Sequence, residues 1–292
     1  MKKILITGAN SYIGTALESY LAQWPDDFWV DTVDMIGNAW RERSFAGYDT
    51  VFHVAGIAHS DVGRLSDAQR ARYYQVNTDL AIETARKAKE DGVGQFIFMS
   101  SAIVYGNSAG LGKTKHIDKN TPTAPANCYG DSKAKAEQGI LPLNDDGFKV
   151  VVLRPPMVYG PGSKGNYPTL AKIARMTPMF PKVDNQRSML YVKNLTEFIR
   201  LMIVNEESGI FWPQNREYVN TTELARMIAN AHGKTLITVP GFAWALKLMS
   251  HVTGLVDKAF GSLTYDMSLS EYPQEYRIVG LEESIQETEG IS

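Results

Sequence analysis

The sequence predicts an α/β protein built on a doubly wound parallel sheet, and two features of its 292 residues support this fold class. Short apolar runs, rich in β-branched residues, alternate with longer segments in which apolar residues recur at helical spacing. A glycine-containing turn, "TGANSYIG" (7–14), follows the first apolar run. Because helical crossovers join parallel strands and cover both faces of their sheet, this alternation indicates the doubly wound arrangement.

Five strands are expected in the first half of the chain, and they lie at 2–7, 28–34, 49–56, 95–101 and 148–155. Helices are expected between them at 13–24, 73–92 and 132–141. The Gly- and Pro-rich stretch 157–168 predicts an irregular loop, and Asn220 followed by Glu223 predicts a capped helix start. We therefore expect a cofactor-binding domain over 1–155. A smaller substrate-binding lobe is expected over 156–292, with segments that return to the sheet.

Composition argues against several classes of partner. The net charge is −2 and the basic residues are scattered, so neither nucleic acid nor an anionic membrane surface is expected to bind. Cys128 is the single cysteine, and the five histidines show no paired spacing, so no disulfide and no metal site are expected. The apolar stretch 239–256 is interrupted by Lys247, and the amino-terminal apolar run is too short for a signal peptide. We expect no membrane span and a cytoplasmic protein.

The turn at 7–14 has features of a phosphate-binding turn. Gly8 would permit the tight turn after the strand, and Gly14 would permit close packing of the next helix. Ser11 stands where such turns usually carry their middle glycine, and its hydroxyl could donate to a phosphate oxygen. Many α/β proteins have glycines after their first strand, so an ordinary strand–turn–helix is the alternative interpretation.

An acidic residue at the end of the second strand would bind the ribose of a dinucleotide. Asp34 lies about 20 residues after the turn and is the better candidate, whereas Asp31 is less well placed. A carboxylate here favours NAD, because it repels the 2′-phosphate of NADP. Arg41 and Arg43, which follow, keep NADP open.

Ser101, Tyr129 and Lys133 are the candidate catalytic residues. Tyr129 and Lys133 are four positions apart, so they share one face of a helix. A lysine ammonium beside a phenol is expected to lower the tyrosine pKa, which would let Tyr129 exchange a proton with a carbonyl or alcohol oxygen. Ser101, at the end of the fourth strand, could hydrogen-bond to the same oxygen. An incidental surface pair is the alternative for Tyr129 and Lys133 taken alone.

Together with these residues, four further motifs give the chain a resemblance to the extended short-chain dehydrogenase/reductases, a family of NAD-dependent sugar-nucleotide epimerases, dehydratases and reductases. The motifs are "VFHVAG" (51–56), Asn77 in "YQVNTDL", "LRPPMVYGPG" (153–162) and "NQRSMLYVKNL" (185–195). The resemblance implies a Rossmann-type domain, the catalytic set Ser101, Tyr129 and Lys133, and NAD as cofactor, with NADP as the other option. It also implies that Tyr129 and Lys133 contact the cofactor, together with Gly8, Asn10, Ser11, Tyr12, Ile13, Gly14, Asp34, Val54, Ala55, Gly56, Asn77 and Pro156.

For the substrate, the same resemblance implies a nucleotide sugar contacted by Ser101, Tyr105, Met157, Asn166 and Arg187. Arg187 would meet the diphosphate, whereas a simple turn role is an equal alternative for Asn166. His59 follows the third strand and could face the substrate, although a structural role is favoured for a loop histidine without a visible partner. A homodimer through 73–90 and 130–141 is a further implication of the resemblance.

The residues also bear on the type of reaction. Dehydratases of the family carry an Asp-Glu pair beside the catalytic hydroxyl, whereas this chain reads Ser101-Ala102-Ile103. Epimerases commonly read R-Y-F-N-V where this chain reads "RPPMV" (154–158), so the asparagine is replaced by Met157. The segments that begin at Arg154 and at Asn185 are similar in sequence to those of bacterial 4-reductases of UDP-linked 4-keto-6-deoxy-N-acetylhexosamines in surface polysaccharide synthesis. We expect that reductase activity, with UDP-hexose or UDP-N-acetylhexosamine 4-epimerase as the alternative and a non-catalytic NAD-binding regulator as the remote one.

Overall fold

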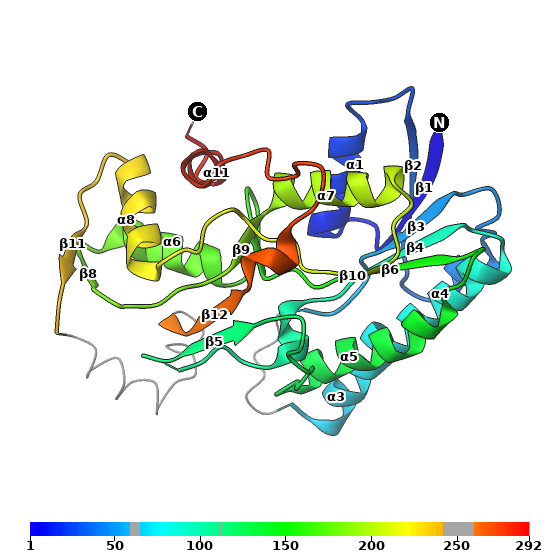
Figure 1. The fold of residues 1–292 in the computed structure, drawn as a ribbon, viewed down its shortest axis with the longest axis horizontal. Helices are drawn as coiled ribbons and strands as arrows, with labels where there is room; N and C mark the ends of the chain where they lie inside the picture. Colours follow the sequence, from blue (N-terminus) through cyan, green and yellow to red (C-terminus); the bar gives the residue numbers. More distant parts are fainter. Residues whose placement is uncertain (59–64, 111, 242–259, 292) are drawn as a thin grey trace. The chain divides into compact units, whose positions relative to one another are not determined.

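The computed structural model describes residues 1–58, 65–110, 112–241 and 260–291, and the chain forms two compact units (Figure 1). Unit 1 comprises Met1–Gly106, Pro122–Pro155 and Leu195–Pro213. Unit 2 comprises Asn107–Thr121, Pro156–Asn194 and Gln214–Ser292. The division differs from the expected boundary at residue 155 in one place, because segment 107–121 belongs to unit 2. Segment 195–213 belongs to unit 1, and a return of later segments to the sheet was expected.

A six-stranded parallel sheet forms the centre of unit 1. Its strands are β1 (Lys2–Thr7), β2 (Phe28–Val33), β3 (Thr50–His53), β4 (Gln95–Met99), β6 (Lys149–Leu153) and β10 (Gly209–Phe211). They lie in the order β10-β6-β4-β3-β1-β2, which confirms the predicted doubly wound sheet. All five predicted strands are present, and the sixth, β10, comes from the second half of the chain. Four of the five stop earlier than predicted, because the residues after them leave the ladder and form the loops at the carboxyl edge.

The helical elements of unit 1 cover both faces of this sheet. They are α1 (Tyr12–Leu21), α2 (Ala39–Glu42), α3 (Asp67–Tyr74), the π-helical turn η1 (Gln75–Asp79), α4 (Leu80–Glu90), the 3₁₀ turns η2 (Ala102–Tyr105) and η3 (Leu141–Leu143), α5 (Cys128–Ile140) and most of α7 (Val192–Val204). In Figure 1, α1 and α7 lie on one face, whereas α4 and α5 lie on the other.

Two predicted helices need correction. The single helix expected at 73–92 is a longer run from 67 to 90 that the π-helical turn interrupts. The helix expected at 132–141 begins four residues earlier, because the Asn127 side chain accepts a hydrogen bond of 2.9 Å from Gly130 N and caps the helix there. The early start places Tyr129 in the first turn of α5.

Unit 2 is built from small pieces of secondary structure. Within its described residues, the strands form three two-stranded parallel pairs: β5 (Thr114–Ile117) with β12 (Ser262–Tyr265), β7 (Met157–Tyr159) with β9 (Met189–Tyr191), and β8 (Met179–Pro181) with β11 (Ile237–Val239). The helical elements in the same residues are α6 (Asn166–Met176), α8 (Thr221–Ala231), the 3₁₀ turn η4 (Met267–Ser270) and α11 (Leu281–Thr288). The predicted irregular loop at 157–168 is therefore wrong at both ends, where β7 and α6 form.

The predicted helix start at Asn220 is confirmed. The Asn220 side chain accepts hydrogen bonds from the backbone amides of Thr222, at 2.8 Å, and Glu223, at 3.2 Å. The Glu223 carboxylate pairs with Arg226 one turn later. Asn220 thus satisfies two amides that α8 would otherwise leave without an acceptor.

Candidate active site

The strand order of unit 1 reverses between β1 and β3, and this switch point locates the site. From β1 the chain moves first to β2 on one side, and later strands extend the sheet on the other side. The loops after β1 and β3 therefore diverge at the carboxyl edge, where open α/β sheets bind ligands. Gly8, directly after β1, has φ of +104°, and a Cβ at this position would lie 2.8 Å from the backbone N of Ala55. Both the conformation and the close approach require a glycine there.

Ser11 occupies the middle position of the turn without strain. Its φ of −72° and ψ of 144° are ordinary extended values, and its hydroxyl oxygen accepts a hydrogen bond of 3.2 Å from Gly14 N. The serine therefore acts as the N-cap of α1, a role for which serine is among the preferred residues. A Cβ on Gly14 would lie 2.5 Å from Ser11 Oγ and 3.2 Å from the side chains of both Ile6 and Val54, so close packing at this position favours glycine.

Asn10, Tyr12 and Ile13 complete the turn. Asn10 has φ of +63°, a left-handed conformation that asparagine tolerates better than most residues. The Tyr12 hydroxyl is buried and has no hydrogen-bond partner within the described residues, and burial raises the pKa of this phenol. A buried polar atom without a partner is uncommon. Together with the Gly8 conformation, it shows that this turn fits a polar ligand such as a dinucleotide diphosphate.

Asp34 lies one residue beyond β2 and is exposed. It lies close to the turn, because Gly8 N donates a hydrogen bond of 2.9 Å to the carbonyl of Val33. Its Oδ1 accepts a bond from the Ile36 amide, which fixes the carboxylate at the strand end. Asp31, the second choice, accepts a hydrogen bond of 2.5 Å from the Tyr48 hydroxyl. Asp34 is therefore the better placed of the two carboxylates, and its contact with a ribose stays a prediction.

The candidate catalytic residues come from α5 and the end of β4. Tyr129 and Lys133 lie on one face of α5, and Ser101 precedes the η2 turn, where its Oγ accepts a bond of 3.3 Å from Ile103 N. The Tyr129 hydroxyl is hydrogen-bonded to Ser101. The Lys133 ammonium donates a bond of 2.8 Å to the Met99 carbonyl and lies 4.6 Å from the centre of the Phe98 ring. The structure thus brings all three residues together at the end of β4.

The electrostatics of the pair differ from the sequence-based expectation. We expected Lys133 to lower the pKa of Tyr129, but burial raises that pKa to about 12. The lowering influence comes from the hydrogen bond with Ser101. Burial lowers the pKa of Lys133 to about 8, and the Glu137 carboxylate opposes this shift. The expectation was wrong because it counted the charge of the ammonium and left out the cost of removing both groups from water.

Asn77 and Gly56 connect the loop after β3 to this cluster. The buried Asn77 amide accepts a bond of 2.8 Å from Ile57 N and donates to Ile57 O and to Ser132 Oγ, each at 3.1 Å. A Cβ on Gly56 would lie 3.1 Å from Asn77 Oδ1 and 3.3 Å from Lys133 Nζ. Asn77 therefore fixes the loop after β3 against α5, so its role here is structural, whereas direct contact with the cofactor stays a prediction.

His53, in the segment "VFHVAG", is buried, and its local sequence gives no sign of this. Its Nδ1 lies 2.7 Å from the Thr7 hydroxyl, its ring stacks against Phe96 and Phe98, and its Nε2 has no partner within the described residues. Burial, with a smaller contribution from the Lys133 ammonium, lowers the pKa of His53 to about 3. The histidine is therefore neutral at physiological pH.

This buried histidine predicts an acid-sensitive fold. Between pH 6.5 and 3 the unfolded chain binds a proton at His53 that the folded chain does not, so stability falls as the pH falls. At about pH 4.5 the loss from this one group is about 2–3 kcal/mol. Urea titrations at pH 7 and pH 4.5 should therefore show a smaller loss in His53→Gln than in the wild type. Equal losses in the wild type and in His53→Gln would contradict this assignment.

The predicted substrate residues have different positions. Tyr105 is buried, and its hydroxyl accepts bonds of 2.7 Å from both Arg154 Nη1 and Trp212 Nε1, which argues against the predicted contact with substrate. Arg187 belongs to unit 2, where its backbone bridges to Val219 and Leu263, and burial lowers its pKa to about 10. Of the remaining predictions, Asn166 is the exposed first residue of α6, Met157 begins β7, Pro156 is buried in unit 2, and His59 lies outside the described residues.

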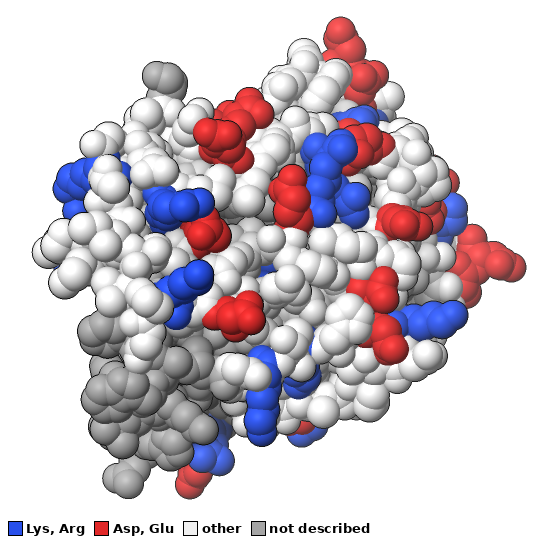
Figure 2. Space-filling view, turned by 60° about the vertical axis from the view of Figure 1, so that its left-hand side comes forward, with Lys and Arg blue, Asp and Glu red and all other residues white. Residues whose placement is uncertain are grey.

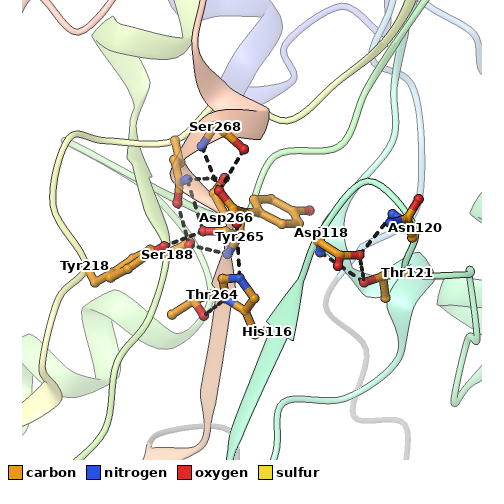
Figure 3. Close-up of polar contacts among 11 residues, drawn as sticks. His116, Asp118, Asn120, Thr121, Ser188, Tyr218, Thr264, Tyr265, Asp266 and Ser268 are labelled. Atoms are coloured by element: carbon orange, nitrogen blue, oxygen red, sulfur yellow. Dashed lines mark hydrogen bonds and ion pairs between the residues drawn. The ribbon is translucent and has the colours of Figure 1, made fainter.

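Other kinds of site find no support in the described part of the chain. It contains no group of three or more metal-ligating side chains. Figure 3 shows His116, on β5, pointing toward Thr264 and Asp266 at the end of β12, but Asp266 already accepts bonds from Ser268. Figure 2 shows one face of the molecule, on which basic and acidic side chains are interspersed. Within the same residues, no helix combines the length and apolarity that a bilayer crossing requires.

The parallel sheet and the glycine turn after β1 have the features of a nicotinamide dinucleotide-binding domain, and comparison with known families agrees. The model of the NAD-dependent epimerase/dehydratase family matches residues 4–212. The chain belongs to this family, which confirms the predicted resemblance and the predicted nicotinamide dinucleotide cofactor.

Individual relatives include both epimerases and reductases. A UDP-glucose 4-epimerase of Vibrio cholerae is 29% identical over 91% of this chain and 88% of its own length. An N-acetyl-α-D-glucosaminyl-diphospho-ditrans,octacis-undecaprenol 4-epimerase of Escherichia coli O157:H7 is 30% identical over 70% of this chain and 64% of its own. Among solved structures, dTDP-4-dehydrorhamnose reductase of Bacillus anthracis with NADP has a TM-score of 0.73 at 19% identity, and covers 99% of both chains. UDP-glucuronic acid 4-epimerase of Bacillus cereus with NAD has a TM-score of 0.74 at 17% identity, and the match covers 99% of this chain and 97% of the epimerase chain. At these identities, the structural matches show the fold.

Proposed function

We propose that this protein reduces the C4 keto group of a UDP-linked 4-keto-6-deoxy-N-acetylhexosamine, a reaction of surface polysaccharide synthesis. The observation that carries the proposal is Met157. This apolar, half-buried residue at the start of β7 stands where the epimerase motif has an asparagine. An apolar side chain suits the methyl group of a 6-deoxy sugar, whereas an amide would suit a hydroxyl.

The protonated Tyr129 is compatible with a role as the acid of a ketone reduction. With its pKa raised to about 12, the phenol stays protonated at physiological pH and can donate a proton to a ketone oxygen. Ser101, already hydrogen-bonded to Tyr129, would donate a second bond to the same oxygen. The cofactor supplies the hydride. The same tyrosine serves as base when an alcohol is oxidised and as acid when a ketone is reduced, so its protonation alone favours neither candidate.

The charged groups near the cofactor edge favour NAD over NADP. Asp34 would accept hydrogen bonds from ribose hydroxyls and repel a 2′-phosphate. Arg41 and Arg43, which could have bound the 2′-phosphate of NADP, form hydrogen bonds to other groups of the protein. Arg41 pairs with Glu83, at 2.5 and 2.7 Å, and Arg43 donates to the Thr32 carbonyl and to the Tyr48 hydroxyl, at 3.2 and 2.7 Å.

Arg187 is our proposed contact for the substrate diphosphate. Burial has already removed much of the water around its guanidinium, and a desolvated arginine binds phosphate strongly. Asn166 would add a contact from the exposed start of α6. These two proposed contacts to the substrate lie in unit 2, and the proposed substrate is a nucleotide sugar.

A UDP-hexose or UDP-N-acetylhexosamine 4-epimerase is the second candidate. The Vibrio cholerae relative, described as a UDP-glucose 4-epimerase, favours it because the similarity extends over 91% of this chain. Both candidates use the same Ser101, Tyr129 and Lys133 set. They differ in whether reduced cofactor is consumed.

A redox assay distinguishes the candidates. Purified protein mixed with NADH and UDP-4-keto-6-deoxy-N-acetylglucosamine should lower the absorbance at 340 nm in proportion to the sugar reduced. The same protein with UDP-N-acetylglucosamine and NAD should form no UDP-N-acetylgalactosamine. Formation of that epimer without NADH consumption would replace the reductase by the epimerase. Tight NAD binding with turnover of neither substrate would favour the regulator.

A further inference from the structure

A second group of buried polar side chains lies next to the candidate catalytic residues. Glu137 and Arg154 form an ion pair in which both side chains are less than 10% exposed. Arg154 Nε lies 3.1 and 3.2 Å from the two carboxylate oxygens, and Nη2 donates a bond of 2.5 Å to Oε2. Two charges removed from water carry a large desolvation cost, so a pair in this place suggests a role beyond stability.

The spacing of residues on α5 connects this pair to the active site. Tyr129, Lys133 and Glu137 are successive members of an i, i+4 row on one helix face. All three contact the end of β4. Tyr129 bonds to Ser101, Lys133 donates to the Met99 carbonyl, and the Glu137 carboxylate accepts a bond from the Ser100 hydroxyl.

Arg154 extends the contact to the turn that follows Ser101. Its Nη1 donates to the Tyr105 hydroxyl at 2.7 Å, and Tyr105 is the last residue of η2, the turn that Ser101 begins. Ser100 N and Ala102 N also donate to the carbonyls of Leu153 and Pro155, on either side of Arg154. The backbone around Ser101 is therefore held by β6 and by the ion pair together.

We propose that the Glu137–Arg154 pair is a positioning element of the active site, which holds Ser101 against Tyr129, and that the Glu137 carboxylate of this pair helps to keep Lys133 cationic. The inference rests on the proposed catalytic roles of Ser101, Tyr129 and Lys133. Its charge argument follows from the surroundings of Lys133. His53, on β3, is neutral, Tyr129 is a neutral phenol, and the Glu137 carboxylate opposes the effect of burial on the Lys133 pKa.

The test measures the protonation of Lys133 directly by NMR, on protein that carries ¹³C-labelled lysine, with Lys133→Met identifying its signal. In the wild type the Cε shift should titrate with a midpoint near 8. In Glu137→Gln the midpoint should fall by about one pH unit or more, because the opposing carboxylate is gone. The alkaline limb of the kcat profile should move by the same amount.

Glu137→Gln leaves the Arg154 charge buried without its partner, which endangers folding, so the double variant Glu137→Met with Arg154→Met is decisive. Replacing both charges by apolar side chains of similar length commonly preserves a fold. This variant should be folded by thermal melting, and its Lys133 midpoint should still be lowered. Glu197→Gln is the matched control, because that carboxylate pairs with Arg200 at 2.7 Å on α7 and should leave the midpoint unchanged.

A wild-type Lys133 midpoint in the folded double variant would overturn the inference. The titration of Lys133 does not require turnover, so its outcome can be distinguished from a failure of the proposed function. If the protein reduces no nucleotide sugar, the catalytic proposal fails while the Lys133 titration still reports on the pair.

Discussion

Replacing Tyr129 with phenylalanine is expected to lower kcat by roughly 10²–10⁴-fold, the range typical of a lost general acid. The hydroxyl that Ser101 holds would be absent, so no group would donate a proton to the ketone oxygen. NAD affinity, measured by isothermal titration calorimetry, should change little, because the glycine turn and Asp34 are untouched. Steady-state consumption of NADH gives kcat for both proteins.

Tyr74→Phe provides a matched control for the loss of a tyrosine hydroxyl. The Tyr74 hydroxyl donates a bond of 2.8 Å to Asp131, on the same helix as Tyr129, and it takes no part in the proposed reaction. Its kcat should stay within about twofold of the wild type. If Tyr129→Phe retained comparable turnover, Tyr129 could not be the acid.

The second large effect is expected for Gly8→Ala. The new Cβ would lie within 3 Å of the Ala55 backbone, at a φ of +104° that alanine rarely adopts. Strain and overpacking together should lower the free energy of unfolding by about 2–4 kcal/mol. Since the turn must shift, NAD affinity should fall at least tenfold by calorimetry.

Gly47→Ala separates the effect of backbone strain from the effect of overpacking. Gly47 also has a positive φ, of +85°, but a Cβ there would meet nothing within 4 Å. It should cost only the conformational strain, about 1 kcal/mol, and leave NAD binding intact. If Gly8→Ala bound NAD with wild-type affinity, the glycine turn could not be part of the cofactor site.

The parts of this fold that could be predicted from the sequence are those with a local signature. Continuous apolar runs mark β1, β3, β4 and β6, because strands buried on both faces carry few polar residues. The Tyr129–Lys133 pair was also visible, since helical spacing alone brings the two side chains to one face.

The parts that could not be predicted depend on contacts between distant segments. Strand β10 pairs with β6 only after the chain has left for unit 2 and returned, and three residues carry no strong pattern of their own. The pKa values of Tyr129 and Lys133 follow from burial, which no local motif reveals. Glu137 was overlooked, although its position four residues after Lys133 could have indicated it.

The most direct test of the central claim uses NADH that carries deuterium at the transferred C4 position of the nicotinamide. After reaction with the UDP-4-keto-6-deoxy-N-acetylhexosamine, mass spectrometry and NMR should find one deuterium at C4 of the product sugar for each NADH oxidised. With Tyr129→Phe in place of the wild type, the rate of label incorporation should fall by the same factor as kcat. A product sugar without deuterium, with NADH left unconsumed, would contradict the assignment of this site to ketone reduction.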